Sequence, residues 1–152
     1  MIEGNSEDLY QEIILDHYRN PRNCCVIENP HRKIEGFNPL CGDTLTVYLN
    51  LENGVIKNIS FQGSGCAISK ASASLMTKNT KGKTVEDAEK LFNMVHLLVT
   101  KGPDILESID TLGELAALSG IYKFPSRVKC AILAWQALMA ALRSKDKTVT
   151  TE

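Results

Sequence analysis

Three cysteines and one aspartate have the residue types and positions that metal binding or sulfur transfer requires. Cys41 comes just before one predicted strand, and Cys66 comes just after the next strand. Because an antiparallel hairpin brings these two ends together, we expect both thiols at its open end. Asp43 lies two residues after Cys41, so both side chains face the same way in an extended segment, and Gly42 lets the backbone bend between them.

Two of the cysteines also lie at predicted helix starts. Cys66 opens a predicted helix over residues 66–79, where free amide groups and the helix dipole stabilise a thiolate. Cys130 lies near the start of the last predicted helix and points roughly opposite its apolar stripe, so the main core does not explain it. It could instead be a small residue for close helix packing, because its side of the helix carries alanines: Ala134, Ala137 and Ala141.

Three thiolates and a carboxylate suit a tetrahedral zinc ion, which accepts sulfur and oxygen ligands. The same set suits iron and sulfide, since thiolates also bind iron-sulfur clusters. Four anionic ligands around a divalent ion leave about two negative charges, which Arg127, Lys129 or Lys70 would offset if they face inward. A purely structural zinc site is disfavoured because aspartate is a weaker ligand than cysteine. The simplest alternative is core packing, because free cysteine is among the most buried residue types.

Alternating apolar residues predict the hairpin that positions the first two thiols. Residues 44–52 and 55–61 alternate with the period of half-buried strands, and an Asn-Gly pair between them supplies the turn. A two-residue loop would place Leu49 opposite Asn58, so we expect a three-residue loop that keeps one apolar face. The expected partners are Leu51 with Val55, Val47 with Ile59, Leu45 with Phe61 and Cys41 with Gly65.

Capping residues and helical periodicity predict the remaining helices. The first begins at Asn5-Ser6 and ends near Asn20, and irregular chain follows to about Leu40. Thr84 with Asp87 resembles a capping box. It opens a helix that Gly102-Pro103 ends.

The C-terminal part is predicted to hold a helical insert, a long helix and a tail. The insert covers residues 104–124, and the long helix starts at Pro125. Five apolar residues form one narrow stripe on this helix: Val128, Ile132, Trp135, Met139 and Leu142. The polar stretch 144–152 is expected to be frayed.

Composition favours one globular domain that works with protein partners. The chain has 152 residues, 43% hydrophobic and 23% charged, with a formal net charge of -1. We expect a single domain over residues 1–152, with neither nucleic acid nor membrane as a partner. The longest apolar tract, Ala131–Leu142, is too short to span a bilayer. With no secretory signal and five cysteines, we expect reduced thiols and a cytoplasmic protein.

The other cysteines and the histidines are interpreted as structural. Cys24 and Cys25 are adjacent and would pair only with strain. His96 lies at the edge of an apolar helix face and is expected to pack there half-buried. We expect similar packing roles for His17 and His31.

Four motifs make the chain resemble the IscU/SufU family of iron-sulfur scaffold and sulfur-transfer proteins over nearly its whole length. They are Tyr10–Asn23, Asn38–Asp43, Gly63–Ser69 and Arg127–Ala131. The resemblance implies an α+β fold, with a small antiparallel sheet of about three strands and helices packed on one face. It also implies a ligand set, because Cys41, Asp43, Cys66 and Cys130 match the family's ligand positions.

Two departures make the chain more similar to SufU than to IscU. Lys129 stands where IscU-type proteins have a histidine, and Phe124–Val128 stands where they have the chaperone motif Leu-Pro-Pro-Val-Lys. In addition, Asp104–Tyr122 is similar to the insertion of SufU-type proteins.

The likeness to SufU implies a zinc-dependent sulfurtransferase of iron-sulfur cluster biogenesis. Cys41 would accept persulfide sulfur from a SufS-like cysteine desulfurase and pass it to downstream assembly proteins, while Asp43, Cys66 and Cys130 hold zinc. Arg127 matches a basic residue of that site. The alternative is a non-enzymatic scaffold on which a [2Fe-2S] cluster is assembled and transferred.

Overall fold

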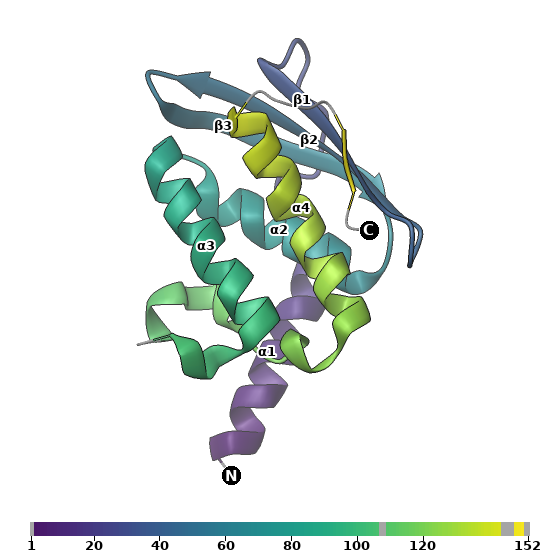
Figure 1. Ribbon diagram of the computed structural model, residues 1–152, viewed down its shortest axis with the longest axis vertical. Coiled ribbons are helices and arrows are strands. Elements are labelled where there is room, and N and C mark those ends of the chain that lie inside the picture. Colours follow the sequence, from purple (N-terminus) through teal and green to yellow (C-terminus); the bar gives the residue numbers. More distant parts are fainter. Residues whose placement is uncertain (1, 107–108, 144–147, 151–152) are drawn as a thin grey trace.

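The computed structural model describes residues 2–106, 109–143 and 148–150, and it shows a sheet with the helices gathered on one side (Figure 1). The elements in chain order are α1 (Ile2–Arg19), β1 (Arg32–Asn38), β2 (Asp43–Glu52), β3 (Val55–Ser64), α2 (Ala67–Thr80), α3 (Val85–Lys101), η1 (Pro103–Ile105), η2 (Asp110–Leu118), η3 (Ile121–Lys123), α4 (Pro125–Arg143) and β4 (Thr148–Thr150). The α+β class with a small antiparallel sheet is therefore confirmed.

The sheet has the strand order β3-β2-β1-β4, and its first three strands are antiparallel. Strand β1 lies in the segment that was expected to be irregular, so that prediction was wrong. Burial alternates along β1 as a strand requires. Its composition hides this, because Lys33, Glu35, Gly36 and Asn38 have low strand propensity.

Strand β4 pairs in parallel with Glu35–Phe37 of β1. It lies in the stretch that was expected to be frayed, so residues 148–150 depart from that expectation. Main-chain hydrogen bonding at a sheet edge does not depend on apolar side chains, and a polar segment can therefore add a strand. The other residues of this stretch, 144–147 and 151–152, lie outside the described part of the chain.

The turn between β2 and β3 is shorter than expected. Asn53 and Gly54 have φ values of 55° and 76°, which are typical of a two-residue type I′ turn. A bulge then leaves Lys57 unpaired, because Asn50 pairs with Asn58 while Leu51 pairs with Ile56.

This bulge explains why the predicted register was wrong. The extra residue places Leu49 opposite Ile59, so a two-residue turn keeps one apolar face after all. The pairing runs only to Thr44 and Ser64, and Cys41 therefore does not pair with Gly65.

Helix α4 crosses the middle of the molecule between the sheet and the other helices (Figure 1). Its predicted start at Pro125 is confirmed, and the residues of the predicted stripe pack inward. Burial is wider than that stripe, because the helix is buried on nearly all sides from Cys130 to Ala141. The indole of Trp135 donates to Ser72 Oγ at 3.2 Å, and Ser72 donates to the carbonyl of Ala131 at 2.6 Å. Since these bonds join α2 to α4, they hold the helix that carries Cys130.

The ends of the helices follow the expected signals with one exception. Thr84 caps α3 by accepting from the amide of Asp87 at 3.1 Å, and Gly102 ends that helix. Helix α1 begins at Ile2, before the expected start at Asn5-Ser6. Residues outside proline and glycine differ by at most about 0.7 kcal/mol in helix propensity, so a capping residue type does not by itself force a helix start.

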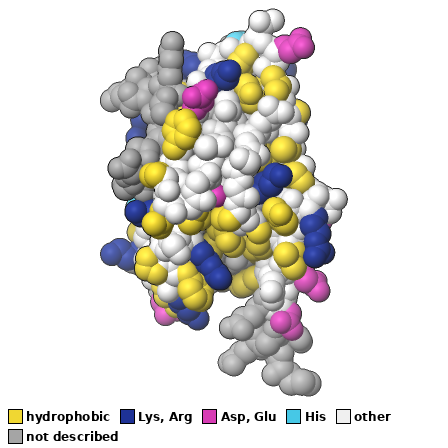
Figure 2. Space-filling model, turned by 90° about the vertical axis from the view of Figure 1, so that its right-hand side faces the viewer, with side chains coloured by type: hydrophobic (Ala, Val, Ile, Leu, Met, Phe, Trp, Pro, Cys, Tyr) yellow, Lys and Arg dark blue, Asp and Glu magenta, His cyan; other side chains and the backbone are white. Residues whose placement is uncertain are grey.

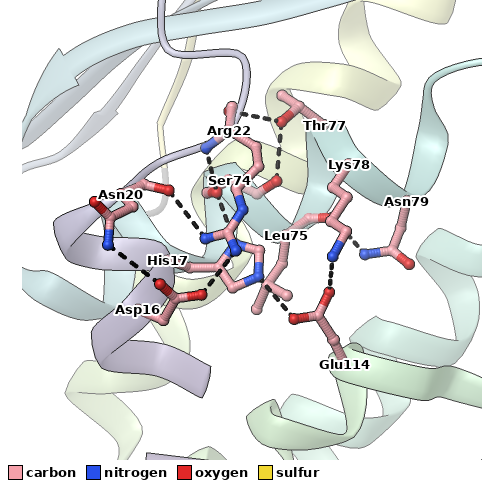
Figure 3. A network of polar contacts seen from close by, with 10 residues as sticks. All are labelled: Asp16, His17, Asn20, Arg22, Ser74, Leu75, Thr77, Lys78, Asn79 and Glu114. Carbon is pink, nitrogen blue, oxygen red and sulfur yellow. Dashed lines mark hydrogen bonds and ion pairs between the residues drawn. The ribbon is translucent and has the colours of Figure 1, made fainter. Parts of the chain in front are cut away.

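A buried polar network joins α1 to α2 and to η2 (Figure 3). Ser74 Oγ accepts from the amide of Arg22 at 2.8 Å, so its proton is free for His17 Nδ1 at 2.7 Å. His17 Nε2 then donates to Glu114 Oε2 at 3.1 Å, and Lys78 pairs with the same carboxylate. The expected packing role of His17 is thus a polar one that links three segments.

Candidate functional site

The turn between β1 and β2 presents Cys41. The carbonyl of Asn38 accepts from the amide of Gly42 at 2.8 Å, which closes the turn. Gly42 has a φ of +74°, a conformation in which other residues are strained. Cys41 is exposed on this turn, whereas Asp43, the first residue of β2, is fully buried.

Cys41, Asp43 and Cys130 come together although they lie far apart in sequence. One ligand atom from each lies within 4.8 Å of the other two. A tetrahedral zinc ion keeps its ligand atoms roughly 3.3–3.8 Å apart, given ligand bonds of about 2.0–2.3 Å. Small side-chain rotations are therefore enough to close this group around an ion.

Cys66 approaches the same group from the start of α2. Its sulfur caps the helix by accepting from the amide of Ser69 at 3.5 Å. Its own amide donates to Asp43 Oδ1 at 2.9 Å, but its sulfur is not part of the group whose ligand atoms all lie within 4.8 Å of one another. The predicted helix start at Cys66 is confirmed, and this start also orients Asp43.

The glycine before Cys66 lets the β3–α2 connection pass close to Asp43. A Cβ atom at Gly65 would lie 2.4 Å from Asp43 Oδ1. Only glycine fits there while Asp43 keeps its position.

The electrostatics of the cluster favour a cation. Burial raises the pKa of the Cys130 thiol far above its usual value, and the side chains of Asp43, Cys66 and Cys41 raise it further. A bound metal ion reverses this effect, because a coordinating thiol loses its proton. The donor set of three sulfurs and one carboxylate fits zinc or iron rather than the hard cations magnesium and calcium.

A cleft of about 860 Å³ opens at this cluster. The three thiols line it together with α1, the start of α2, and the segment between α3 and α4. Figure 2 shows this side of the molecule, where hydrophobic side chains surround a hollow with basic side chains nearby. The insert predicted over residues 104–124 thus supplies one wall of the cleft, mainly through Ser119–Phe124.

The three basic residues expected near the metal differ in their positions relative to the cleft. Arg127 lines the cleft, with its guanidinium 4.3 Å from the centre of the Phe124 ring. Lys129 is not among the cleft residues in the described part of the chain. Lys70 lies over the Tyr18 ring at 6.0 Å. Of these three residues, Arg127 alone lines the cleft, and Lys123 is a second basic residue of its wall.

The remaining cysteines and histidines lie apart from the cluster within the described residues. Cys24 and Cys25 are both exposed, and Cys24 forms a main-chain bridge beside Phe61. His31 accepts from the amide of Leu51 at 3.0 Å. His96 is exposed, so the prediction that it is half-buried was wrong; it lies 5.8 Å from Phe92 at the rim of its helix face.

One residue of the site was not anticipated. Asn38 is fully buried, and its amide donates both to Asp43 and to Cys130. Its position directly before Pro39 suggested only a turn.

A cluster of three thiols and a carboxylate at the mouth of a cleft defines a thiolate metal-binding or sulfur-carrying protein. Comparison with known proteins agrees with this class. Residues 9–131 match the NifU-like N-terminal domain, and the chain belongs to that family. The resemblance to IscU and SufU proteins that the motifs indicated is therefore confirmed.

Three relatives illustrate the family. The chain is 42% identical to the zinc-dependent sulfurtransferase SufU of Bacillus subtilis, over 94% of this chain and 95% of that protein. It is 38% identical to the iron-sulfur cluster assembly scaffold protein IscU of Thermotoga maritima, over 89% of this chain and 93% of that protein. The crystal structure of FiSufU from Fervidobacterium islandicum, a scaffold candidate for the SUF system, has a TM-score of 0.79 and 32% identity, covering 86% of this chain and 94% of that one.

Among the described residues, no helix combines the length and the apolar character needed to cross a membrane. This agrees with the short apolar tract noted in the sequence.

Proposed function

We propose that this chain is a metal-dependent sulfur-transfer protein of iron-sulfur cluster assembly, with Cys41 as the sulfur acceptor. The observation that carries the proposal is the convergence of Cys41, Asp43 and Cys130 within 4.8 Å at the mouth of a cleft. Cys66 is the proposed fourth member of the set, because it caps the start of α2 and its amide donates to Asp43. Similarity to a protein named as a zinc-dependent sulfurtransferase supports the same activity.

Zinc is the proposed metal, and Cys41, Asp43, Cys66 and Cys130 are its proposed ligands. When bound, zinc would keep the thiols deprotonated and shielded from oxidation. The buried Asp43 and Cys130 are the fixed part of the site, and the turn residue Cys41 is the accessible part.

The proposed transfer is a thiol exchange at Cys41. A cysteine desulfurase of the SufS type would bring a persulfide into the cleft, and the Cys41 thiolate would attack its outer sulfur. A new S–S bond forms at Cys41 Sγ while the partner's S–S bond breaks. The electron pair leaves on the partner's cysteine, which departs as a thiolate. Arg127, at the rim of the cleft, is placed to attract negatively charged groups.

The second candidate is a scaffold that assembles and transfers a [2Fe-2S] cluster. Similarity to proteins named as IscU scaffolds favours it, and the same thiols are suitable ligands for iron. Lys129 in place of the histidine of IscU-type proteins favours sulfur transfer instead. Under either function the acceptors are downstream proteins of cluster assembly, and the reduced thiols suit the proposed cytoplasmic location.

Metal analysis and sulfur transfer together test the proposal. Freshly purified protein should contain about one zinc per chain. With a SufS-type desulfurase and cysteine that carries radioactive sulfur, label should appear on the wild-type chain and be absent from Cys41→Ala. Cys24→Ser is a matched control, because it removes another exposed thiol and should leave the labelling unchanged.

Different results separate the two functions. Equal labelling of Cys41→Ala and wild-type protein would refute the acceptor assignment. A stable, transferable [2Fe-2S] cluster with no persulfide on Cys41 would favour the scaffold. Folded protein that binds neither zinc nor iron would contradict both.

A further inference from the structure

A buried asparagine side chain connects two of the proposed metal ligands. Asn38, the last residue of β1, has no exposed surface. Its Nδ2 atom lies 3.0 Å from Asp43 Oδ2 and 3.3 Å from Cys130 Sγ. Its Oδ1 atom is buried and has no hydrogen-bond partner among the described residues.

The chemistry of its neighbours decides which way the amide points. An ionised carboxylate can only accept hydrogen bonds, so the group facing Asp43 must be the amide nitrogen. The same nitrogen carries a second proton, which is directed at the sulfur of Cys130. The amide therefore gives both protons to ligands and leaves its oxygen unpaired.

Acidic and apolar side chains would not do this. Aspartate would place a second negative charge against Asp43, and an apolar residue would donate nothing. The local turn does not explain the side chain either, because the turn is closed by the Asn38 carbonyl and the Gly42 amide. A buried amide with an unpaired oxygen is unfavourable for folding. Its two hydrogen-bond donors are therefore the feature that suits asparagine to this position.

We propose that Asn38 is a positioning residue that holds Asp43 and Cys130 in the arrangement needed for metal binding. This inference rests on the proposed metal site. Asp43 lies on β2 and Cys130 lies on α4, and the Nδ2 donor of Asn38 links these two proposed ligands. Donation to the thiolate also stabilises its negative charge when a metal is bound. Among the described residues, the Asn38 side chain donates to Asp43 and Cys130.

Zinc and cobalt binding by purified full-length variants tests the role of Asn38. We expect Asn38→Ala to weaken zinc binding by about 10- to 100-fold, the usual loss when a partner of a metal ligand is removed. A competing chromophoric chelator measures the affinity. The visible spectrum of the cobalt-substituted protein should shift as well, because the ligand geometry changes. Asn38→Ser keeps one donor and should fall between wild-type protein and Asn38→Ala.

Asn79→Ala is the matched control. Asn79 is partly buried, whereas Asn38 is fully buried, and the Nδ2 atom of Asn79 also donates at short range, to the Leu75 carbonyl at 2.7 Å within α2. This variant should keep the zinc affinity and cobalt spectrum of the wild-type protein, even if its thermal stability falls. With this control, the loss of an amide side chain alone would not explain a lower zinc affinity of Asn38→Ala.

The outcomes separate this inference from the proposed function. If the wild-type chain binds no metal, the proposed function fails and the role of Asn38 fails with it. If wild-type protein binds zinc and Asn38→Ala binds it equally, with the same cobalt spectrum, only the role of Asn38 is refuted. If Asn38→Ala does not fold, Asn38→Ser decides, and wild-type affinity in that variant would overturn the inference.

Discussion

Replacement of Gly65 by alanine would test whether Asp43 must keep its position for the site to bind metal. The added Cβ would lie 2.4 Å from Asp43 Oδ1 and 3.0 Å from its Cγ. Ordinary contacts begin at 3.4 Å, so the carboxylate would have to retreat by 3.4 − 2.4 = 1.0 Å. Gly65 does not have a positive φ, so alanine is compatible with its backbone and the contact with Asp43 is the main perturbation.

A retreat of this size is large for a metal site, where ligand distances are held to within about 0.2 Å. We expect zinc affinity to fall by at least about 100-fold, since losing an outer partner of a ligand already costs about 10- to 100-fold. The crowding should also destabilise the metal-free protein by about 1–3 kcal/mol. Chelator competition measures the first effect, and thermal unfolding of the metal-free protein measures the second.

Gly120→Ala is the control, because a Cβ there meets no atom within 4 Å and its φ of -88° suits alanine. In a background of Asp43→Ala, the Gly65→Ala change should add little further loss of zinc affinity, since the two act through one carboxylate. Wild-type zinc affinity in Gly65→Ala would refute the ligand role of Asp43 in the observed position. A full additional loss in the double variant would show that Gly65 acts through another group.

Three further predictions concern the cap, the buried histidine and the metal. Cys66→Ser should weaken zinc binding but preserve the thermal stability of the metal-free protein, because serine is a favoured helix N-cap; a large loss of that stability would contradict the capping role. Burial lowers the pKa of His17 below its usual 6.5, so the folded state releases this proton more readily than the unfolded chain. Stability from His17 is therefore complete above about pH 6.5 and is lost as the pH falls, by at most about 1.4 kcal/mol per pH unit. Denaturant unfolding between pH 7 and 5 should show this slope, and His17→Gln should remove it; an equal slope in the variant would refute the assignment. Finally, zinc at 100 times its Kd should stabilise the protein by about 2.7 kcal/mol relative to chelator-treated protein, and equal unfolding midpoints would indicate that no site forms in the native state.

Local sequence signals were enough to expect Cys41, Asp43 and Cys66 near one end of the hairpin. Alternation identified the hairpin, and glycines before Cys66 marked a helix start that the structure confirms. The position of Cys130 beside the hairpin could not be derived from local patterns. It reaches the hairpin from α4, and its hydrogen bond with Asn38 joins residues 92 positions apart. Asn38 was missed for the same reason, since an asparagine before a proline is typical of any turn.

The errors in the fold also have physical causes. The register was wrong because one bulged residue, Lys57, restores a pairing that turn length alone seems to exclude. Strand β1 was missed because charged residues and glycine separate its two strand-favouring residues, Ile34 and Phe37, which weakens the propensity signal, although pairing with β2 determines the strand. The burial of α4 depends on elements on both sides of it, which periodicity within one helix does not describe.

The proposed metal ligands and the outer walls of the cleft are held by different contacts, although the three thiols themselves line the cleft that a partner would enter. The ligands are held by β1, β2 and the starts of α2 and α4, through Asn38 and the capping of Cys66. The walls are α1 and the insert, and these are joined behind the cleft by the contact of His17 with Glu114. Because the contact of His17 with Glu114 involves none of the proposed ligands, loosening it should alter the fit of a partner more than the affinity for zinc. Changes at Asn38 should have the opposite effect. The hydrogen bonds of Asn38 would thus position the metal, and the contact of His17 with Glu114 would position the partner, independently of each other.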